Sequence, residues 1–172
     1  MKRILIDTNI FGLIAGDKDR LKIVNAILKS NFIFYGTKLN RNELRAVPRN
    51  VIVGGRNLRV DLLTLFDAIV SKHIYSITEE MKDIANNYYK AYVEFGGSKS
   101  KNDVINDFVI VACATVHNLD IVVSNDEKSM STENALKSYR LVNSIIKKKT
   151  PNFIDYLKFK KILRGGMSNE FV

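Results

Sequence analysis

The sequence predicts an α/β fold in which a central parallel sheet is covered by helices on both faces. Apolar runs rich in β-branched residues lie at 2–6, 32–35, 73–77 and 120–124, and such runs are typical of buried strands. Segments with apolar residues at helical spacing separate them. Strands that alternate with helices form parallel sheets, and ligands of these sheets gather beyond the carboxyl ends of the strands.

In the first half of the chain, each predicted strand leads into a helical segment. Leu21, Val24 and Leu28 have helical spacing, and a short helical stretch ends before Pro48, whose ring disfavours helical backbone at the preceding residue. We therefore expect strands at Lys2–Ile6 and Phe32–Tyr35, and helices over 18–29, 42–47 and 62–70.

The second half continues the alternation. Thr78 is a plausible N-cap for a helix that ends at Gly96-Gly97, and Glu79 and Glu80 suit the dipole of its first turn. The helix over 103–117 is apolar on most of its surface, which indicates a central position. A strand at 120–124 and a helix over 134–146 follow, a last helix is expected to start at Thr150-Pro151, and 165–172 reads as a frayed tail.

Length and composition indicate one cytoplasmic domain. The chain has 172 residues, 46% of them hydrophobic, which is enough for a single core over 1–153 with a C-terminal helix and tail over 154–172 packed on it. A lone Cys113 excludes an internal disulfide, and no signal peptide is visible. The longest apolar run, Phe108–Val116, is far shorter than a membrane span, so we expect no contact with a membrane.

The charge balance favours a polyanionic partner. The net charge of +9 comes from 27 Lys and Arg against 18 Asp and Glu, and nucleic acid is the simplest such partner, although an ordinary basic surface is the alternative. Two histidines and one cysteine argue against a zinc site. No G-x-x-x-x-G-K-[ST] phosphate loop occurs.

Acidic residues follow the predicted strands. Asp7 and Asp126 each come after a buried run, and Glu43 follows the second strand on its short helix. Asp103 and Asp107 are four residues apart, so they share one face of the central helix. Because the carboxyl ends of parallel strands meet at one edge, we expect these acids to gather there.

Each acid also has a structural explanation. Asp7 is a candidate helix cap, Asp103 a partner of a helix dipole, Glu43 an ion-pair partner of Arg41 or Arg45, and Asp126 a turn residue. A cluster is harder to explain in this way, because two carboxylates 4 Å apart repel by about 4 kcal/mol at an effective dielectric constant of about 20. A hard divalent cation, Mg²⁺ or Mn²⁺, relieves that repulsion.

Four motifs carry a resemblance to a known family. D-T-N follows the first strand, N-x-E-L the second, D-F-V-I-V-A-C-A lies in the central helix and V-V-S-N-D ends the fourth strand, with T-P-x-F near the end. In this order they resemble the PIN-domain family of VapC-like metal-dependent ribonucleases. The resemblance implies a three-layer α/β/α sandwich whose metal-site acids are Asp7, Glu43, Asp107 and Asp126, with Asp103 as a possible extra acid. Asn9, Ser124 and Asn125 would orient those acids or the substrate.

The resemblance also implies a function. We expect Mg²⁺- or Mn²⁺-dependent hydrolysis of single-stranded RNA, with RNA contacts from Arg41, Arg45 and Arg49. The chain would then be a toxin paired with a small antitoxin protein, or a housekeeping RNA-processing nuclease. We expect a homodimer, with the apolar helices around 62–70 and 81–92 as candidate interfaces.

Two other classes of function stay open. One is an RNA-binding or scaffolding module with little catalysis, which would show a damaged acid set. The other is a phosphatase or phosphoryl-transfer enzyme on another α/β sheet, but Asn9 stands where a haloacid-dehalogenase-like enzyme would have the second Asp of D-x-D.

Overall fold

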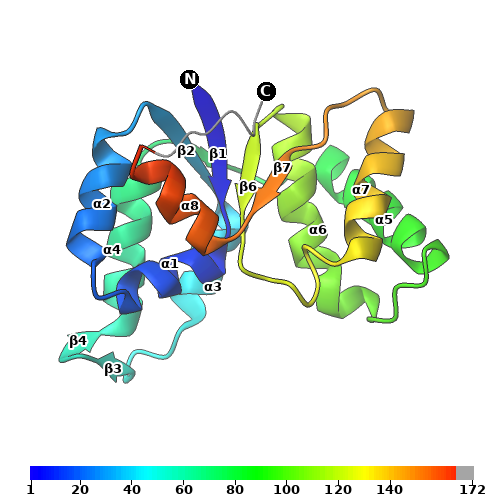
Figure 1. Ribbon diagram of the computed structural model, residues 1–172. Coiled ribbons are helices and arrows are strands. Elements are labelled where there is room, and N and C mark those ends of the chain that lie inside the picture. The colour runs from blue at the N-terminus through cyan, green and yellow to red at the C-terminus, as the bar shows by residue number, and fades with distance from the viewer. Residues whose placement is uncertain (166–172) are drawn as a thin grey trace.

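The computed structural model describes residues 1–165, which form an α/β fold around one five-stranded parallel sheet (Figure 1). The strand order is β5-β2-β1-β6-β7, so β1 is central, and Leu5 pairs with Tyr35 of β2 on one side and Val122 of β6 on the other. The predicted fold class is therefore confirmed. The strands are β1 Lys2–Ile6, β2 Phe32–Thr37, β5 Ile74–Tyr75, β6 Ile121–Val123 and β7 Asn152–Ile154.

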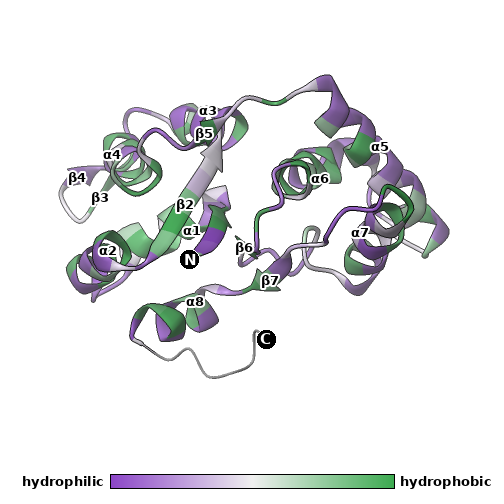
Figure 2. Ribbon diagram, turned by 90° about the horizontal axis from the view of Figure 1, so that it is seen from above, coloured by the Kyte–Doolittle hydropathy of each residue, from purple (hydrophilic) through white to green (hydrophobic). Residues whose placement is uncertain are grey.

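Helices cover both faces of the sheet, and each face has its own hydrophobic core. Alternation along β1 divides its side chains, since Ile4 and Ile6 face one core and Leu5 the other, and all three are fully buried. The core that contains Ile4 and Ile6 packs against four helices: α1 Thr8–Gly16, α2 Arg20–Lys29, α4 Leu58–Val70 and α8 Tyr156–Leu163. The core that contains Leu5 packs against α5 Glu79–Glu94, α6 Lys101–Val116 and α7 Glu133–Ile145, which lie on the opposite side of the sheet in Figure 2.

The central position predicted for α6 is confirmed, because its residues Phe108–Thr115 are all buried. This explains why the helix is apolar nearly all round. The apolar stripes of α4 and α5, considered as dimer interfaces, are themselves buried in this fold, for example Phe66 and Tyr88. Within residues 1–165, no helix is both long enough and apolar enough to cross a membrane.

The C-terminal prediction is partly wrong. Thr150-Pro151 does not start a helix; it leads into β7, which pairs in parallel with β6, and α8 begins only after its N-cap, Asp155. The tertiary pairing of Phe153 with Val122 outweighs the local cap-then-proline signal. The expected boundary between 153 and 154 lies inside this strand, and α8 packs against α2. The frayed tail expected at 165–172 lies, beyond Gly165, outside the described residues.

Two elements were not predicted. The helix α1 starts directly after Asp7 and reads TNIFGLIAG, whose β-branched and glycine residues have weak helix propensity, but Ile10, Phe11 and Ile14 bury it in the core. A small hairpin joins β3 Ile52–Val53 to β4 Arg56–Asn57 between α3, which spans Lys38–Ala46, and α4. Gly54 and Gly55 both have positive φ, as a two-residue hairpin turn requires.

Candidate active site

Two of the four predicted acids follow strands of the sheet, and the other two lie on helices. Asp7 ends β1, Asp126 follows β6 on one side, and Glu43 lies on α3, which follows β2 on the other side. Asp107 reaches the same edge from the second turn of α6, where its carboxyl senses the charges of the other three. The structure thus brings together all four of these side chains at the carboxyl edge of the sheet.

Asp7 is the most buried of the four, with 5% of its surface exposed. Its carboxylate caps α1 by accepting the N–H of Thr8 at 2.7 Å, so the helix-cap explanation describes its local role correctly. The other carboxylate oxygen accepts the Asn9 side-chain amide at 2.7 Å and the Ser124 hydroxyl at 2.7 Å. Capping and clustering therefore coexist, because the cap uses one oxygen only.

Burial shifts the ionisation of Asp7. Removal from water raises its pKa to about 6, against the opposing hydrogen bonds from Ser124 and Thr8, and the charges of Glu43 and Asp126 raise it further. A carboxylate this deeply buried normally has a cationic partner. Among residues 1–165, no Lys or Arg forms an ion pair with any of the four acids.

Ser129 connects the other two aspartates. Its hydroxyl lies 2.5 Å from Asp107 and also contacts Asp126. One hydroxyl carries one hydrogen, so both contacts are satisfied together when the Asp107 carboxyl is protonated and donates to Ser129 Oγ. Ser129 is itself held by its N–H, which donates to Asp126 at 2.9 Å.

The pKa values of the two carboxyls agree with this arrangement. Burial raises the pKa of Asp107 to about 7, with a contribution from the charges of Asp7, Asp126 and Glu43. Burial also acts to raise the pKa of Asp126, but the hydrogen bonds from Ser129 and from the backbone N–H of Lys128 outweigh it, and the pKa lies below its usual value. Asp126 is thus charged at pH values where Asp107 still holds a proton.

Glu43 is held through Thr8. The Thr8 hydroxyl donates to Glu43 at 2.5 Å and accepts the side-chain amide of Asn40 at 2.9 Å. Asn40 is fully buried and closes the capping box of α3 with Thr37. The start of α1 and the start of α3 are therefore joined at the site, and this chain of bonds sets the position of Glu43.

The residues expected to orient the acids have separate positions. Asn9 donates to both Asp7 and Ser124, and its side-chain oxygen accepts the N–H of Asn125 at 3.1 Å. Ser124 also accepts the N–H of Asp126 at 3.1 Å, which links two of the acids. The Asn125 side chain instead accepts the N–H of Tyr156 at 3.4 Å, at the start of α8.

The predicted RNA-contacting arginines differ in availability. Arg41 is engaged in a two-pronged ion pair with Asp67, at 3.1 and 3.0 Å. Arg45 and Arg49 are exposed, at the end of α3 and before the hairpin. Arg45 and Arg49 therefore remain the better candidates for phosphate contacts.

Thr8, Asn40 and Ser129 were not predicted as site residues. Thr8 stands inside the D-T-N motif, and Asn40 is the fourth residue of the capping-box pattern T-K-L-N. Ser129 gives only a weak signal, since it follows Asp126 by three residues in an Asx-type turn. Its contact with Asp107, 22 residues earlier, depends on tertiary structure.

The donor set has the chemistry of a site for a hard divalent cation. All four side chains offer carboxylate oxygens, which Mg²⁺ and Mn²⁺ prefer, and their charges lack ion-pair partners in the described part of the chain. In residues 1–165, no three Asp, Glu, His or Cys side chains stand as a group that could hold a metal ion. Within these residues the four carboxyls therefore lie near one another without being arranged as a ready set of metal ligands.

Comparisons with known proteins define the family. The PIN domain family model matches residues 4–132, so the chain belongs to the PIN domain family, a family of nucleases. No curated protein matches the sequence.

Solved structures share the fold at low sequence identity. A chain of VapBC2 from Rickettsia felis, bound to a DNA fragment from its promoter, has a TM-score of 0.57 and 12% identity over 90% of this chain and 98% of that chain. VapBC-1 from nontypeable Haemophilus influenzae gives 0.56 and 14% over 90% and 98%. FitAcB from Neisseria gonorrhoeae gives 0.52 and 20% over 77% and 92%.

Asp103 and Asp107 provide a test within one helix. Asp103 is exposed and accepts the Ser100 hydroxyl at 2.6 Å in the first turn of α6, whereas Asp107 lies among the acids. We expect Asp107→Asn to lower nuclease activity more than about 100-fold, because mutating even a residue that only hydrogen-bonds a metal ligand lowers activity by about 10- to 100-fold. Asp103→Asn should lower activity less than about threefold. Steady-state cleavage rates of the two variants measure this, and equal losses would place Asp103 among the acids that act on the substrate.

Proposed function

We propose that this chain is a Mg²⁺- or Mn²⁺-dependent endoribonuclease that hydrolyses phosphodiester bonds of single-stranded RNA. The observation that carries the proposal is the cluster of Asp7, Glu43, Asp107 and Asp126 at the carboxyl edge of the sheet, without an ion-pair partner among residues 1–165. Membership of the PIN domain family supports nuclease chemistry. The choice of RNA rests on the resemblance of the four motifs to metal-dependent ribonucleases.

Each part of the site has a role in this chemistry. The four acids would hold the metal, which when bound lowers the pKa of a coordinated water and stabilises charge on the phosphate. Asn9 and Ser124 fix the Asp7 carboxylate by hydrogen bonds, and Thr8 fixes Glu43. Arg45 and Arg49, exposed beside α3, would bind phosphates of the substrate. Water attacking phosphorus in line would leave a 5′-phosphate and a 3′-hydroxyl.

A toxin paired with a small antitoxin protein is the biological role that we propose. Its support is the shared fold with chains of VapBC and FitAcB complexes, and a housekeeping RNA-processing role is the alternative. A homodimer stays a prediction. Because the stripes of α4 and α5 are buried, its interface would use other surfaces, and light scattering at high protein concentration measures it.

The test of the function is metal-dependent cleavage. Purified chain is incubated with end-labelled single-stranded RNA in Mg²⁺, in Mn²⁺ and in EDTA, and the termini of the products are identified. We expect cleavage in either metal, none in EDTA, and 5′-phosphate products. Full activity in EDTA, or cleavage only of duplex DNA, would contradict the proposal.

A further inference from the structure

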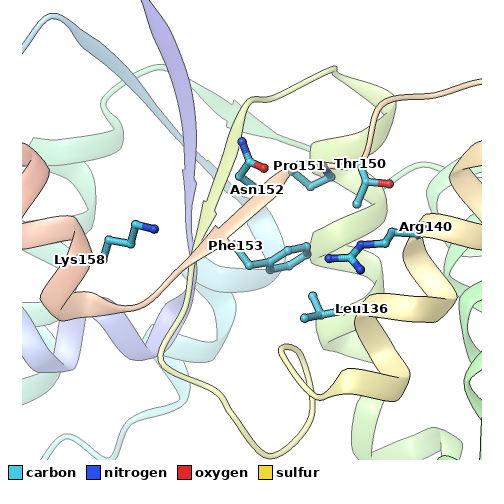
Figure 3. Close-up of a pocket in the computed structure, with 7 residues that line it drawn as sticks. All are labelled: Leu136, Arg140, Thr150, Pro151, Asn152, Phe153 and Lys158. Atoms are coloured by element: carbon cyan, nitrogen blue, oxygen red, sulfur yellow. The ribbon is translucent and has the colours of Figure 1, made fainter. Parts of the chain in front are cut away.

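Two adjoining hollows run along β7, which is the edge strand of the sheet beside β6. The first, of about 340 Å³, lies between α7 and β7 with Arg140, Asn152 and Phe153 in its wall (Figure 3). The second, of about 600 Å³, includes Ser124. Phe153 and Leu136 line both, so the hollows meet at these two side chains.

The second hollow begins at the candidate active site. Ser124 lines it, and the hydroxyl of Ser124 donates to Asp7 at 2.7 Å. The two hollows, which share Phe153 and Leu136, therefore extend from beside Ser124 to Arg140.

The first hollow suits a nucleotide. Arg140 is exposed and makes no ion pair with any residue from 1 to 165, and its planar fork matches a phosphate. Phe153 is half-buried and stacks by one face on Tyr139, with ring centroids 5.5 Å apart. In Figure 3 the ring points towards the α7 side chains Arg140 and Leu136, and Lys158 extends from α8 towards β7. An aromatic ring beside an exposed arginine is a usual platform for single-stranded nucleic acid.

The charges differ between the two hollows. The second hollow is lined by the acids Glu127 and Asp155 and by Glu133, which is ion-paired with Lys137, whereas the first is lined by Arg140 and by no acid. Phosphates away from the metal are therefore attracted to the first hollow and repelled by the second. This difference in charge favours a nucleotide in the first hollow. An acidic peptide residue in the second hollow would be repelled by the acids there.

We infer that the hollow formed by Arg140, Asn152 and Phe153 binds a nucleotide of the RNA substrate that lies several positions from the scissile bond. The inference rests on the proposed function and adds to it a substrate-binding site remote from the reacting phosphate. Arg140 would contact a phosphate and Phe153 a base. A long RNA would therefore bind more tightly than a short RNA that cannot reach this hollow.

The kinetic test compares two substrate lengths. An unstructured 24-nucleotide RNA and a hexanucleotide around its cleavage site are cleaved by the parent, Arg140→Ala, Phe153→Leu and Lys29→Ala. We expect Arg140→Ala and Phe153→Leu each to raise KM for the long RNA roughly fivefold with kcat unchanged, and to leave the hexanucleotide unaffected. Lys29, exposed at the end of α2 on the other face of the sheet, is the matched loss of one positive charge and should change neither. Equal effects on both lengths, or none on the long RNA, would overturn the inference.

A binding test separates this site from catalysis. Anisotropy of a labelled 24-nucleotide RNA in EDTA measures affinity without cleavage. The slope of log affinity against log salt should fall by about 0.7 in Arg140→Ala, as for one lost phosphate contact on a single strand. An unchanged slope and affinity would overturn the site even if the chain proves to be a ribonuclease. Conversely, a reduced slope in a chain that cleaves no RNA would reject the proposed catalysis and keep the site.

Discussion

Asp7→Asn is expected to abolish metal-dependent cleavage of single-stranded RNA, with a loss in kcat/KM of more than about 100-fold. The substitution preserves the shape of the side chain and the oxygen that caps α1, because asparagine is as good a cap as aspartate. It removes the negative charge at the centre of the cluster, where Asn9 and Ser124 donate to the second oxygen. The measurement is the initial rate of cleavage at saturating Mn²⁺.

Asp126→Asn should behave in the same way from the neighbouring strand. The pKa of Asp126 lies below its usual value, so Asp126 carries its charge throughout the pH range near neutrality. Circular dichroism of both variants checks that the fold is retained, and Asp83→Asn, an exposed acid on α5, is the control for a lost charge. Activity that survives in both site variants, in preparations free of contaminating ribonuclease, would remove the assignment.

The positions of the acids could be predicted because they depend on local signals and one topological rule. Asp7 directly follows the buried strand β1, Asp126 follows β6 after Ser124 and Asn125, and parallel strands place such residues at one edge. Asp107 follows from its helix, which is buried on nearly all sides and leaves few directions for a carboxylate. Sequence spacing alone was sufficient for these residues.

The remaining parts depend on contacts between distant segments. The strand β7 has three residues, and only its pairing with β6 distinguishes it from a helix start after Pro151. Ser129 becomes a site residue only when β6 and α6 are packed together, because its partner Asp107 comes from that helix. The helix α1 is formed from residues of low helix propensity that its buried face stabilises. Local patterns carry no information on these pairings.

The same contacts explain how the fold tolerates buried acids without a cation. Ser129 and a proton on Asp107 together neutralise one of two adjacent carboxyls. Thr8 and Asn40 hold Glu43, while Asn9 and Ser124 hold Asp7. Hydroxyl and amide donors therefore stabilise an arrangement in which part of the charge is absent below neutral pH. Metal binding must remove that proton, so it couples the site to pH.

That coupling predicts how the stability of the metal-free protein changes with pH. Burial raises the pKa of Asp107 to about 7, above the value of about 3.9 in an unfolded chain. Between these values the folded state holds a proton that the unfolded state has lost, so the free energy of unfolding falls as pH rises from about 4 to about 7. At about 1.36 kcal/mol for each pH unit between the two pKa values, this corresponds to a loss on the order of 4 kcal/mol from this group. Asp7, with its pKa raised to about 6, adds a smaller loss that ends nearer pH 6.

Asp107→Asn should remove the part of this slope that extends to pH 7. The asparagine amide can donate to Ser129 Oγ, as a protonated carboxyl would, while the Ser129 hydroxyl donates to Asp126. At pH 8 the metal-free variant should therefore be more stable than the parent by about 4 kcal/mol. Mn²⁺ at about a hundredfold excess over Kd should stabilise the parent by about 2.7 kcal/mol, and the variant much less. Urea unfolding at pH 5 and pH 8, with and without Mn²⁺ and with sodium chloride at matched ionic strength, measures both effects. Asp83→Asn should keep the pH slope and the metal response of the parent. A variant that is less stable than the parent at pH 8 and keeps the full response to Mn²⁺ would show that Asp107 is a structural residue, held by Ser129 for packing alone.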